Sequence, residues 1–86
     1  MVMGTDVNEP ITVSAVFDRS QVRPAWFLWG RRRYTIQEVT QRWQTRDGST
    51  YLLHLGVTDG ATCFELIFNQ HTLVWHLASI DTDGRA

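Results

Sequence analysis

From residue 11 onward, apolar and polar positions alternate with a period of two, and turn signals interrupt the alternation at intervals of roughly ten residues. A period of two places successive side chains on opposite faces of a strand, so the pattern is typical of an antiparallel all-β domain. Residues 51–58 are the clearest half-buried strand. Asp59-Gly60 follows it, and this pair favours a tight hairpin because the turn needs positive φ. We expect strands over residues 11–17, 24–30, 51–58, 63–68 and 72–80.

Residues 31–46 allow two interpretations. As a strand, Tyr34 and Ile36 face inward, and a bulge before Val39 restores the phase of the pattern. As a helix, residues 35–44 begin with a capping box and carry one apolar stripe, which would make the protein an α+β domain with one short helix. The Asp-Gly pair directly after the segment favours the strand, because only a strand uses it as a hairpin turn.

About six strands joined by hairpins form a meander, and a flat meander would leave two unprotected edges. Curling into a small barrel or half-barrel reduces that exposure. We therefore predict one all-β antiparallel domain over residues 11–80. Residues 1–10 and 81–86 lack periodic apolar positions and are expected to be a flexible N-terminal tail and a C-terminal tail.

The length and composition limit the class of protein. Eighty-six residues allow one domain, and 43% hydrophobic with 12% aromatic residues excludes an intrinsically disordered chain. Cys63 is the only cysteine, so no intrachain disulfide is possible and a reducing cytoplasm is the expected location. No apolar run approaches the roughly 18 residues that a membrane span needs, so we expect no membrane partner.

Residues that could support catalysis or metal binding do not form a recognisable pattern. His71 and His76 are five positions apart, which places them on opposite faces of a strand, and no close pair of metal ligands occurs. Cys63 lies beside an apolar strand position, as an ordinary half-buried thiol does. Neither the carboxylates nor the glycines match a catalytic or phosphate-binding motif. The sequence predicts a protein that is not an enzyme and has no cofactor and no metal site.

The net charge of −1 conceals an uneven distribution of charge along the chain. Residues 19–46 contain seven arginines and only one acidic residue, Glu38, whereas the segments on both sides are acidic. The same stretch holds five of the ten aromatic residues. Arginines that follow phosphates and rings that stack on bases are the features of single-stranded nucleic-acid surfaces. The nucleic-acid-binding residues that this pattern predicts are Trp29, Arg31, Arg33, Arg42 and Arg46.

Two other interpretations of this segment stay open. The aromatic residues can form the core, with the arginine stems covering their outer edges. Alternatively, Phe27 and Trp29 can be exposed on a strand that is apolar on both faces, and they would then form a patch for a protein partner or a homodimer.

The stretch from Pro24 to Val39, with Trp43 after it, resembles a family of small uncharacterised bacterial all-β domains. The shared pattern is an aromatic strand, Gly-Arg, an aromatic residue, a β-branched residue, then Glu-Val and a Trp. Residues 64–68 and 75–77 look like the closing hairpin of that family, so the resemblance covers about residues 11–80. Some members are encoded near Y-family translesion DNA polymerases. The resemblance implies an accessory role in DNA repair or replication and assigns no catalytic residue.

Overall fold

The computed structural model describes residues 4–19 and 21–81, and every regular element in this part of the chain is a strand. No helix within these residues is long and apolar enough to cross a bilayer. The strands are β1 (Gly4–Asp18), β2 (Gln21–Trp29), β3 (Arg32–Thr35), β4 (Glu38–Asp47), β5 (Thr50–Thr58), β6 (Cys63–Asn69) and β7 (Trp75–Asp81).

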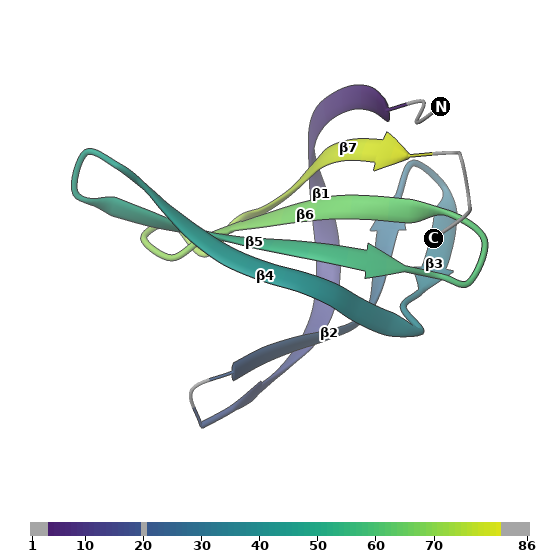
Figure 1. The fold of residues 1–86 in the computed structure, drawn as a ribbon, viewed down its shortest axis with the longest axis horizontal. Coiled ribbons are helices and arrows are strands. Elements are labelled where there is room, and N and C mark those ends of the chain that lie inside the picture. The colour runs from purple at the N-terminus through teal and green to yellow at the C-terminus, as the bar shows by residue number, and fades with distance from the viewer. Residues whose placement is uncertain (1–3, 20, 82–86) are drawn as a thin grey trace.

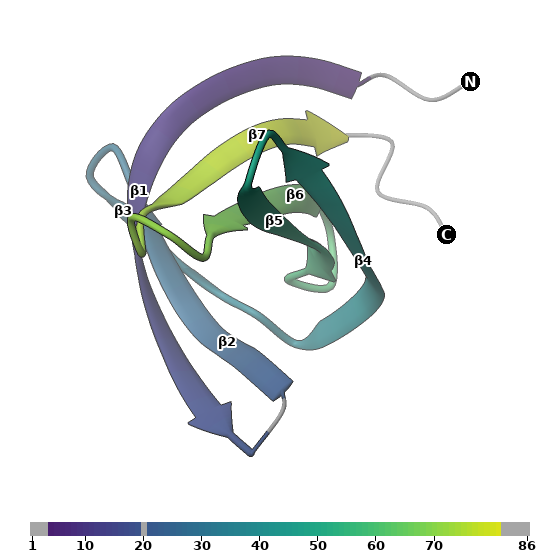
Figure 2. The same ribbon diagram turned by 90° about the vertical axis from the view of Figure 1, so that its left-hand side faces the viewer.

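All seven strands form one antiparallel sheet with the order β3-β2-β1-β7-β6-β5-β4 (Figure 1). The sheet curls on itself, as Figure 2 shows, and β3 and β4 are its edges. Between these two strands, Ile36 N donates to Ala25 O at 2.9 Å and Gln37 N donates to Thr58 O at 2.8 Å. The chain thus connects β2 to β5 at one end, while the sheet does not close. The prediction of a curled, all-β antiparallel meander is confirmed.

The ambiguous segment is two strands, so the alternative of a helix around residues 35–44 is wrong. β3 pairs with β2, whereas β4 pairs with β5 at the opposite edge, and the break at residues 36–37 lets the chain cross between them. The bulge that the pattern requires lies between Val39 and Gln41, just after the expected position. This division of one expected strand into two gives the sheet its seventh strand.

The N-terminal tail is shorter than expected, because residues 4–10 are part of β1 and pair with β7. Asp81, expected in the C-terminal tail, is the last residue of β7. Residues 1–3 and 82–86 of the expected tails lie outside the described residues. At the other end of β7, Leu73 was expected in the strand, but it lies in the preceding loop with φ 64° and is 68% exposed.

The core lies between the β5–β6–β7 part of the sheet and the β2 strand that curls over it. Alternate residues of β5, β6 and β7 face inward, as a period of two requires. Phe27 on β2 is fully buried, with its ring 5.1 Å from the rings of both Tyr34 and Phe64 between centroids. The buried hydrophobic residues are Phe27, Leu55, Val57, Phe64, Leu66, Phe68, Trp75 and Leu77.

Candidate nucleic-acid interface

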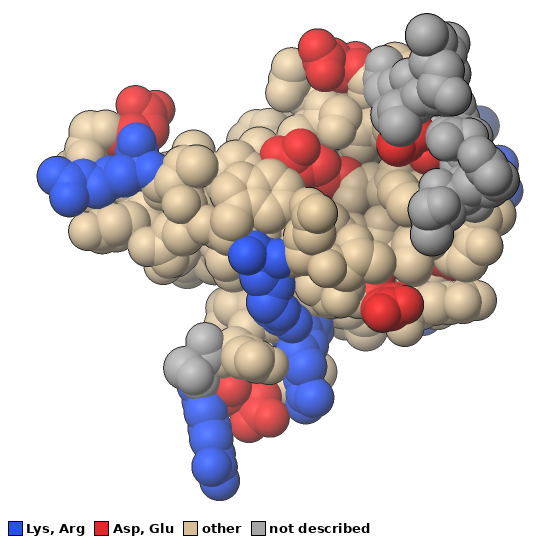
Figure 3. Space-filling model, in the orientation of Figure 1, with Lys and Arg blue, Asp and Glu red and all other residues tan. Residues whose placement is uncertain are grey.

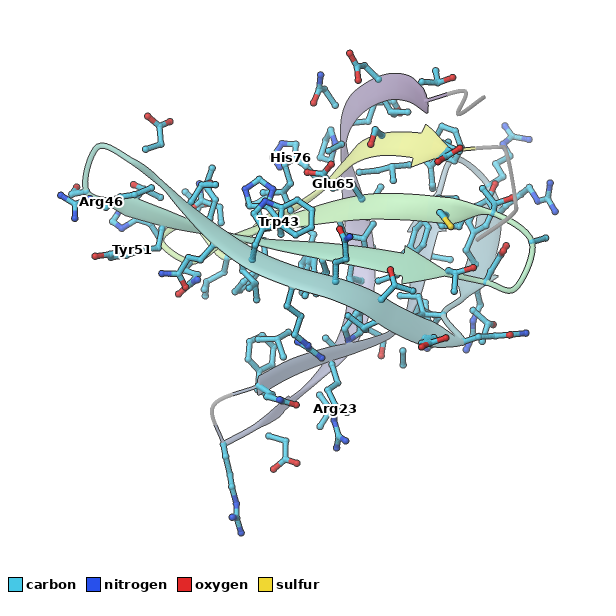
Figure 4. The ribbon with its side chains drawn as sticks, viewed as in Figure 1. Arg23, Trp43, Arg46, Tyr51, Glu65 and His76 are labelled. Carbon is cyan, nitrogen blue, oxygen red and sulfur yellow. The ribbon has the colours of Figure 1, made fainter. Side chains whose placement is uncertain are left out.

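The structure does not bring the five residues predicted to bind nucleic acid together. Arg31 lies in the turn between β2 and β3, and Arg33 lies on β3. Arg42 and Arg46 lie on β4, the opposite edge strand of the sheet. Figures 1 and 4 show β3 on one side of the molecule and Arg46 at the far end of the other. The basic segment of the sequence is therefore two separate groups of arginines.

Trp29 is engaged inside the protein. Its side chain is half-buried, and its indole N–H donates to the Glu9 carboxylate at 3.0 Å. The neighbouring Phe27 is 0% exposed, so the expected exposed patch of Phe27 and Trp29 is wrong. The β1–β2 pairing shifts between Ser14 and Ala15, which leaves Ala25 of β2 without a partner in the register. This bulge changes which alternate residues of β2 point inward, so that Phe27 and Trp29 face the core.

The outward face of β2 carries Trp26 and Leu28 instead. Leu28 is 40% exposed and lies opposite Arg33 in the register. The Arg33 guanidinium lies 4.2 Å from the centroid of the Trp26 ring, so it covers the ring face on which a base would stack. Arg32 lies 5.4 Å from the ring of Tyr34 in the same way. These arginines pack on the sheet's own aromatic residues, which corresponds to the interpretation of arginine stems covering the rings.

The other group of arginines lies on a hairpin that borders a groove. The β1–β2 and β4–β5 hairpins both extend beyond the curled sheet, and Figure 1 shows them projecting to the same side. They project because residues 21–24 of β2 lie beyond its pairing with β3, and because the pairing of β5 with β6 ends at Leu52 and Asn69. The space between them, the hairpin groove, has a volume of about 340 Å³. It is lined by Phe17, Arg19, Gln21, Val22, Gln44, Leu53, Phe68, Gln70 and Leu73.

Arg42 connects the two hairpins. Its Nη1 donates to the backbone carbonyl of Val22 at 2.7 Å, across the seam where β2 and β4 are not paired as strands. Arg46 is on the same face of β4, because it is four positions further along the strand. Its Nε donates to Gly48 O at 2.9 Å, and its guanidinium lies 5.8 Å from the ring of Tyr51, which is 44% exposed. Figure 4 shows Arg46 and Tyr51 together at the end of this hairpin.

The β1–β2 hairpin forms the opposite wall. The Phe17 ring is 63% exposed, and its position is set by an edge contact with Phe68 at 5.8 Å between centroids. Arg19 follows at the tip with φ 57°. Arg23 forms an ion pair with Asp18 at 3.3 Å, and because both side chains are more than half exposed the pair contributes little to stability.

The charge on the two hairpins is positive, although the whole chain is slightly acidic. The described hairpin residues include four arginines, at positions 19, 23, 42 and 46, and two aspartates, at positions 18 and 47. Figure 3 shows basic side chains, in blue, on both hairpins. In the part of the chain that the structure describes, no three His, Cys, Asp or Glu side chains gather as metal ligands. The groove lining and the two hairpins that border it together offer cations, exposed rings and amides.

Two of the five predicted residues, Arg42 and Arg46, belong to this region, while Phe17, Arg19 and Tyr51 were missed. A sequence signal existed for Tyr51, because a hairpin at Asp47-Gly48 places Tyr51 opposite Arg46. Phe17 carried no such signal, because its alternation indicated a core position and only the projection of the hairpin exposes it.

A scan of protein-family models found no match, and neither curated proteins nor solved structures gave a match. A function for this chain must therefore be inferred from the chemistry of the groove.

Proposed function

We propose that this protein is a non-catalytic binding module that holds single-stranded nucleic acid in the hairpin groove. The observation that carries the proposal is that arginines and exposed aromatic rings lie on the two hairpins that border one groove. Phe17 and Arg19 of the β1–β2 hairpin line the groove. Arg42, Arg46 and Tyr51 lie on the β4–β5 hairpin, which contributes Gln44 and Leu53 to the lining.

Each kind of side chain matches one part of a nucleotide. The exposed faces of Phe17 and Tyr51 can stack on bases of any sequence. Arginines at both walls can contact successive phosphates. The amides of Gln44 and Gln70, whose side chains meet at 3.5 Å, can both donate to and accept from base edges. Stacking on protein rings requires unstacked bases, which favours a single strand over a duplex.

The number of arginines predicts the dependence of affinity on salt. Three phosphate contacts, at Arg19, Arg42 and Arg46, give a slope of about −2 for the logarithm of affinity against the logarithm of salt concentration on a single strand. Affinity should therefore fall about 20-fold between about 50 and 200 mM salt. Removing one of the three contacts should lower the slope by about 0.7.

The proposal can be tested by fluorescence anisotropy with a labelled single-stranded 12-mer oligonucleotide of mixed sequence, over a range of salt concentrations. We expect Arg46→Gln to lower both the affinity and the salt slope. Tyr51→Leu should lower the affinity at least about fivefold through lost stacking, with the slope unchanged. Arg32→Gln, which removes an arginine outside the groove, is the matched control and should leave the affinity and the slope within error of the wild type.

The absence of binding at low salt would refute the proposal, and so would an equal loss of affinity in Arg32→Gln and Arg46→Gln. Binding by the protein would support the accessory role in DNA repair or replication that the family resemblance implies, in a bacterial cytoplasm compatible with the single Cys63 thiol.

A second candidate function is docking of a protein or of a second copy of the chain. The observation that favours it is the exposed apolar surface beside the groove, where Phe17, Leu73 and Val74 are each at least 39% exposed. An apolar surface of this kind is typical of protein interfaces. Light scattering over a range of protein concentrations measures the mass of the protein and so tests whether it forms a homodimer through this surface. A mass that rises with concentration in the wild type, but not in Leu73→Ser, would favour self-association.

A further inference from the structure

The outward face of the β4–β7 part of the sheet contains a second concave site, which we name the outer hollow. It has a volume of about 300 Å³ and lies on the face opposite the core. Gly56 leaves space in it, since a Cβ there would lie 3.2 Å from the Thr40 hydroxyl, which itself donates to Gly56 O. The residues that line the outer hollow are Thr40, Gln41, Trp43, Gly56, Val57, Cys63, Phe64, Glu65, Ser79 and Asp81.

Two walls of the outer hollow are held in place by one histidine. The His54 ring stacks on the Trp43 indole with centroids 4.9 Å apart and planes inclined by 17°. His54 Nδ1 lies 3.0 Å from Glu65 Oε2, and His54 Nε2 lies 2.8 Å from the Thr45 hydroxyl. In the neutral ring with the proton on Nδ1, the imidazole donates to Glu65 and accepts from Thr45. The indole and the carboxylate are thus positioned before any ligand arrives.

These two walls remain accessible to solvent. The Trp43 residue is 38% exposed, and the Glu65 side chain is 32% exposed, whereas the His54 side chain between them is only 12% exposed. Figure 4 shows Trp43 and Glu65 on the same face of the sheet. The charged residues that line the outer hollow are Glu65 and Asp81, and its described lining contains no arginine. The charged side chains of its described lining are therefore acidic, whereas the charged side chain that lines the hairpin groove, Arg19, is basic.

We propose that the outer hollow binds the guanidinium group of an arginine side chain from a protein partner. A planar guanidinium can stack on the exposed part of the Trp43 indole that His54 leaves uncovered, and at the same time donate to Glu65 Oε1, because His54 contacts only Oε2. A lysine ammonium cannot combine the two contacts in this planar geometry. A nucleic-acid phosphate is disfavoured, because the Glu65 carboxylate repels it. This site does not depend on nucleic-acid binding in the hairpin groove.

The test is an NMR titration of the ¹⁵N-labelled protein with N-acetylarginine amide, with the neutral isostere N-acetylcitrulline amide as the ligand control. We expect arginine amide to shift the Gly56 amide and the Trp43 indole resonances in a saturable manner. The citrulline compound should produce shifts at least about fivefold smaller at the same concentration, because it lacks the cation. Equal shifts with the two compounds, or shifts spread evenly over the surface, would overturn the proposal.

Variants of the two walls make the test specific. Glu65→Gln preserves an acceptor for His54 but removes the charge, and it should weaken arginine binding at least about fivefold. Glu38→Gln removes a carboxylate outside the lining and should have no effect. Trp43→Leu changes a partly exposed side chain and should also weaken binding, so it provides a second arm if Glu65→Gln does not fold. Unchanged affinity in either folded wall variant would overturn the proposal.

A final arm addresses the source of the arginine. The peptide Gly-Gly-Arg-Gly-Gly should bind at least as tightly as N-acetylarginine amide, because a protein partner presents its arginine within a chain. If the free amide binds and the peptide does not, the hollow is a small-molecule site, and the inference of a protein partner is wrong.

Discussion

The phase of β2 can be tested with two neighbouring substitutions, Phe27→Ala and Leu28→Ala. Phe27 is 0% exposed and its ring lies 5.1 Å from the rings of Tyr34 and Phe64, whereas Leu28 is 40% exposed on the opposite face. Loss of a fully buried phenylalanine with its two ring pairs should cost about 3 to 5 kcal/mol of unfolding free energy. Leu28→Ala should cost less than about 1 kcal/mol.

The magnitude is large relative to the total stability. A domain of this length is expected to have an unfolding free energy of about 4 to 13 kcal/mol, so Phe27→Ala removes a substantial share and can prevent folding. Phe27→Leu therefore belongs in the series, because it keeps an apolar side chain and loses only the two ring pairs. It should cost about 1 to 3 kcal/mol.

The measurement is urea denaturation followed by far-ultraviolet circular dichroism, with unfolding free energies compared at a common m value. The expected order of destabilisation is Phe27→Ala, then Phe27→Leu, then Leu28→Ala. If Leu28→Ala destabilised the protein as much as Phe27→Leu, the assignment of the inward and outward faces of β2 would be wrong. The hypothesis that Phe27 is exposed in an interaction patch would then be favoured again.

Three further outcomes follow from individual contacts. Arg42→Gln removes the hydrogen bond to Val22 O and should accelerate amide hydrogen exchange in the β1–β2 hairpin but not in β6. An equal change of the exchange rates in the hairpin and in β6 would contradict this role. Gly48→Ala should lower the unfolding free energy by about 1 kcal/mol, because Gly48 has φ 65°, a backbone conformation that alanine adopts only with strain. The added methyl group would meet no other atom, so the backbone strain is the whole cost, and Ser49→Ala should be neutral in the same denaturation assay. Glu9→Ala removes the acceptor of the Trp29 indole and should shift that N–H resonance in NMR spectra with a loss of about 1 kcal/mol; an unchanged resonance would exclude the bond.

The local pattern predicted most of the strands because period-two alternation survives wherever a strand has one buried face. In β5, β6 and β7 the alternation seen in the sequence places Leu55, Leu66 and Leu77 at buried positions, whereas Tyr51, in the same phase as Leu55, is 44% exposed because the hairpin projects. Leu73 is a further exception, because a loop with positive φ precedes β7, and the turn residues alone did not show where that loop ends.

The candidate site was less predictable because it depends on contacts between distant segments. Arginine and aromatic density identified the middle of the chain, and Arg42 and Arg46 do lie beside the hairpin groove. The same density gave no indication that Arg33 covers Trp26 or that Trp29 is bonded to Glu9. Those contacts depend on which face of β2 is turned inward, and a strand that is apolar on both faces does not show this.

By itself, the sequence favoured the all-β class over the α+β alternative and determined the antiparallel strand pattern and the position of most turns, because alternation and turn chemistry act between residues close in the chain. Only the tertiary structure decided that residues 31–46 divide into two edge strands and that the arginines separate into two groups. It also decided that Phe17 lines a groove between two hairpins and that Tyr51 lies on the hairpin across from it. The physical reason is that curling the sheet brings together hairpins about 30 residues apart in the chain, and no local pattern encodes how far each hairpin projects.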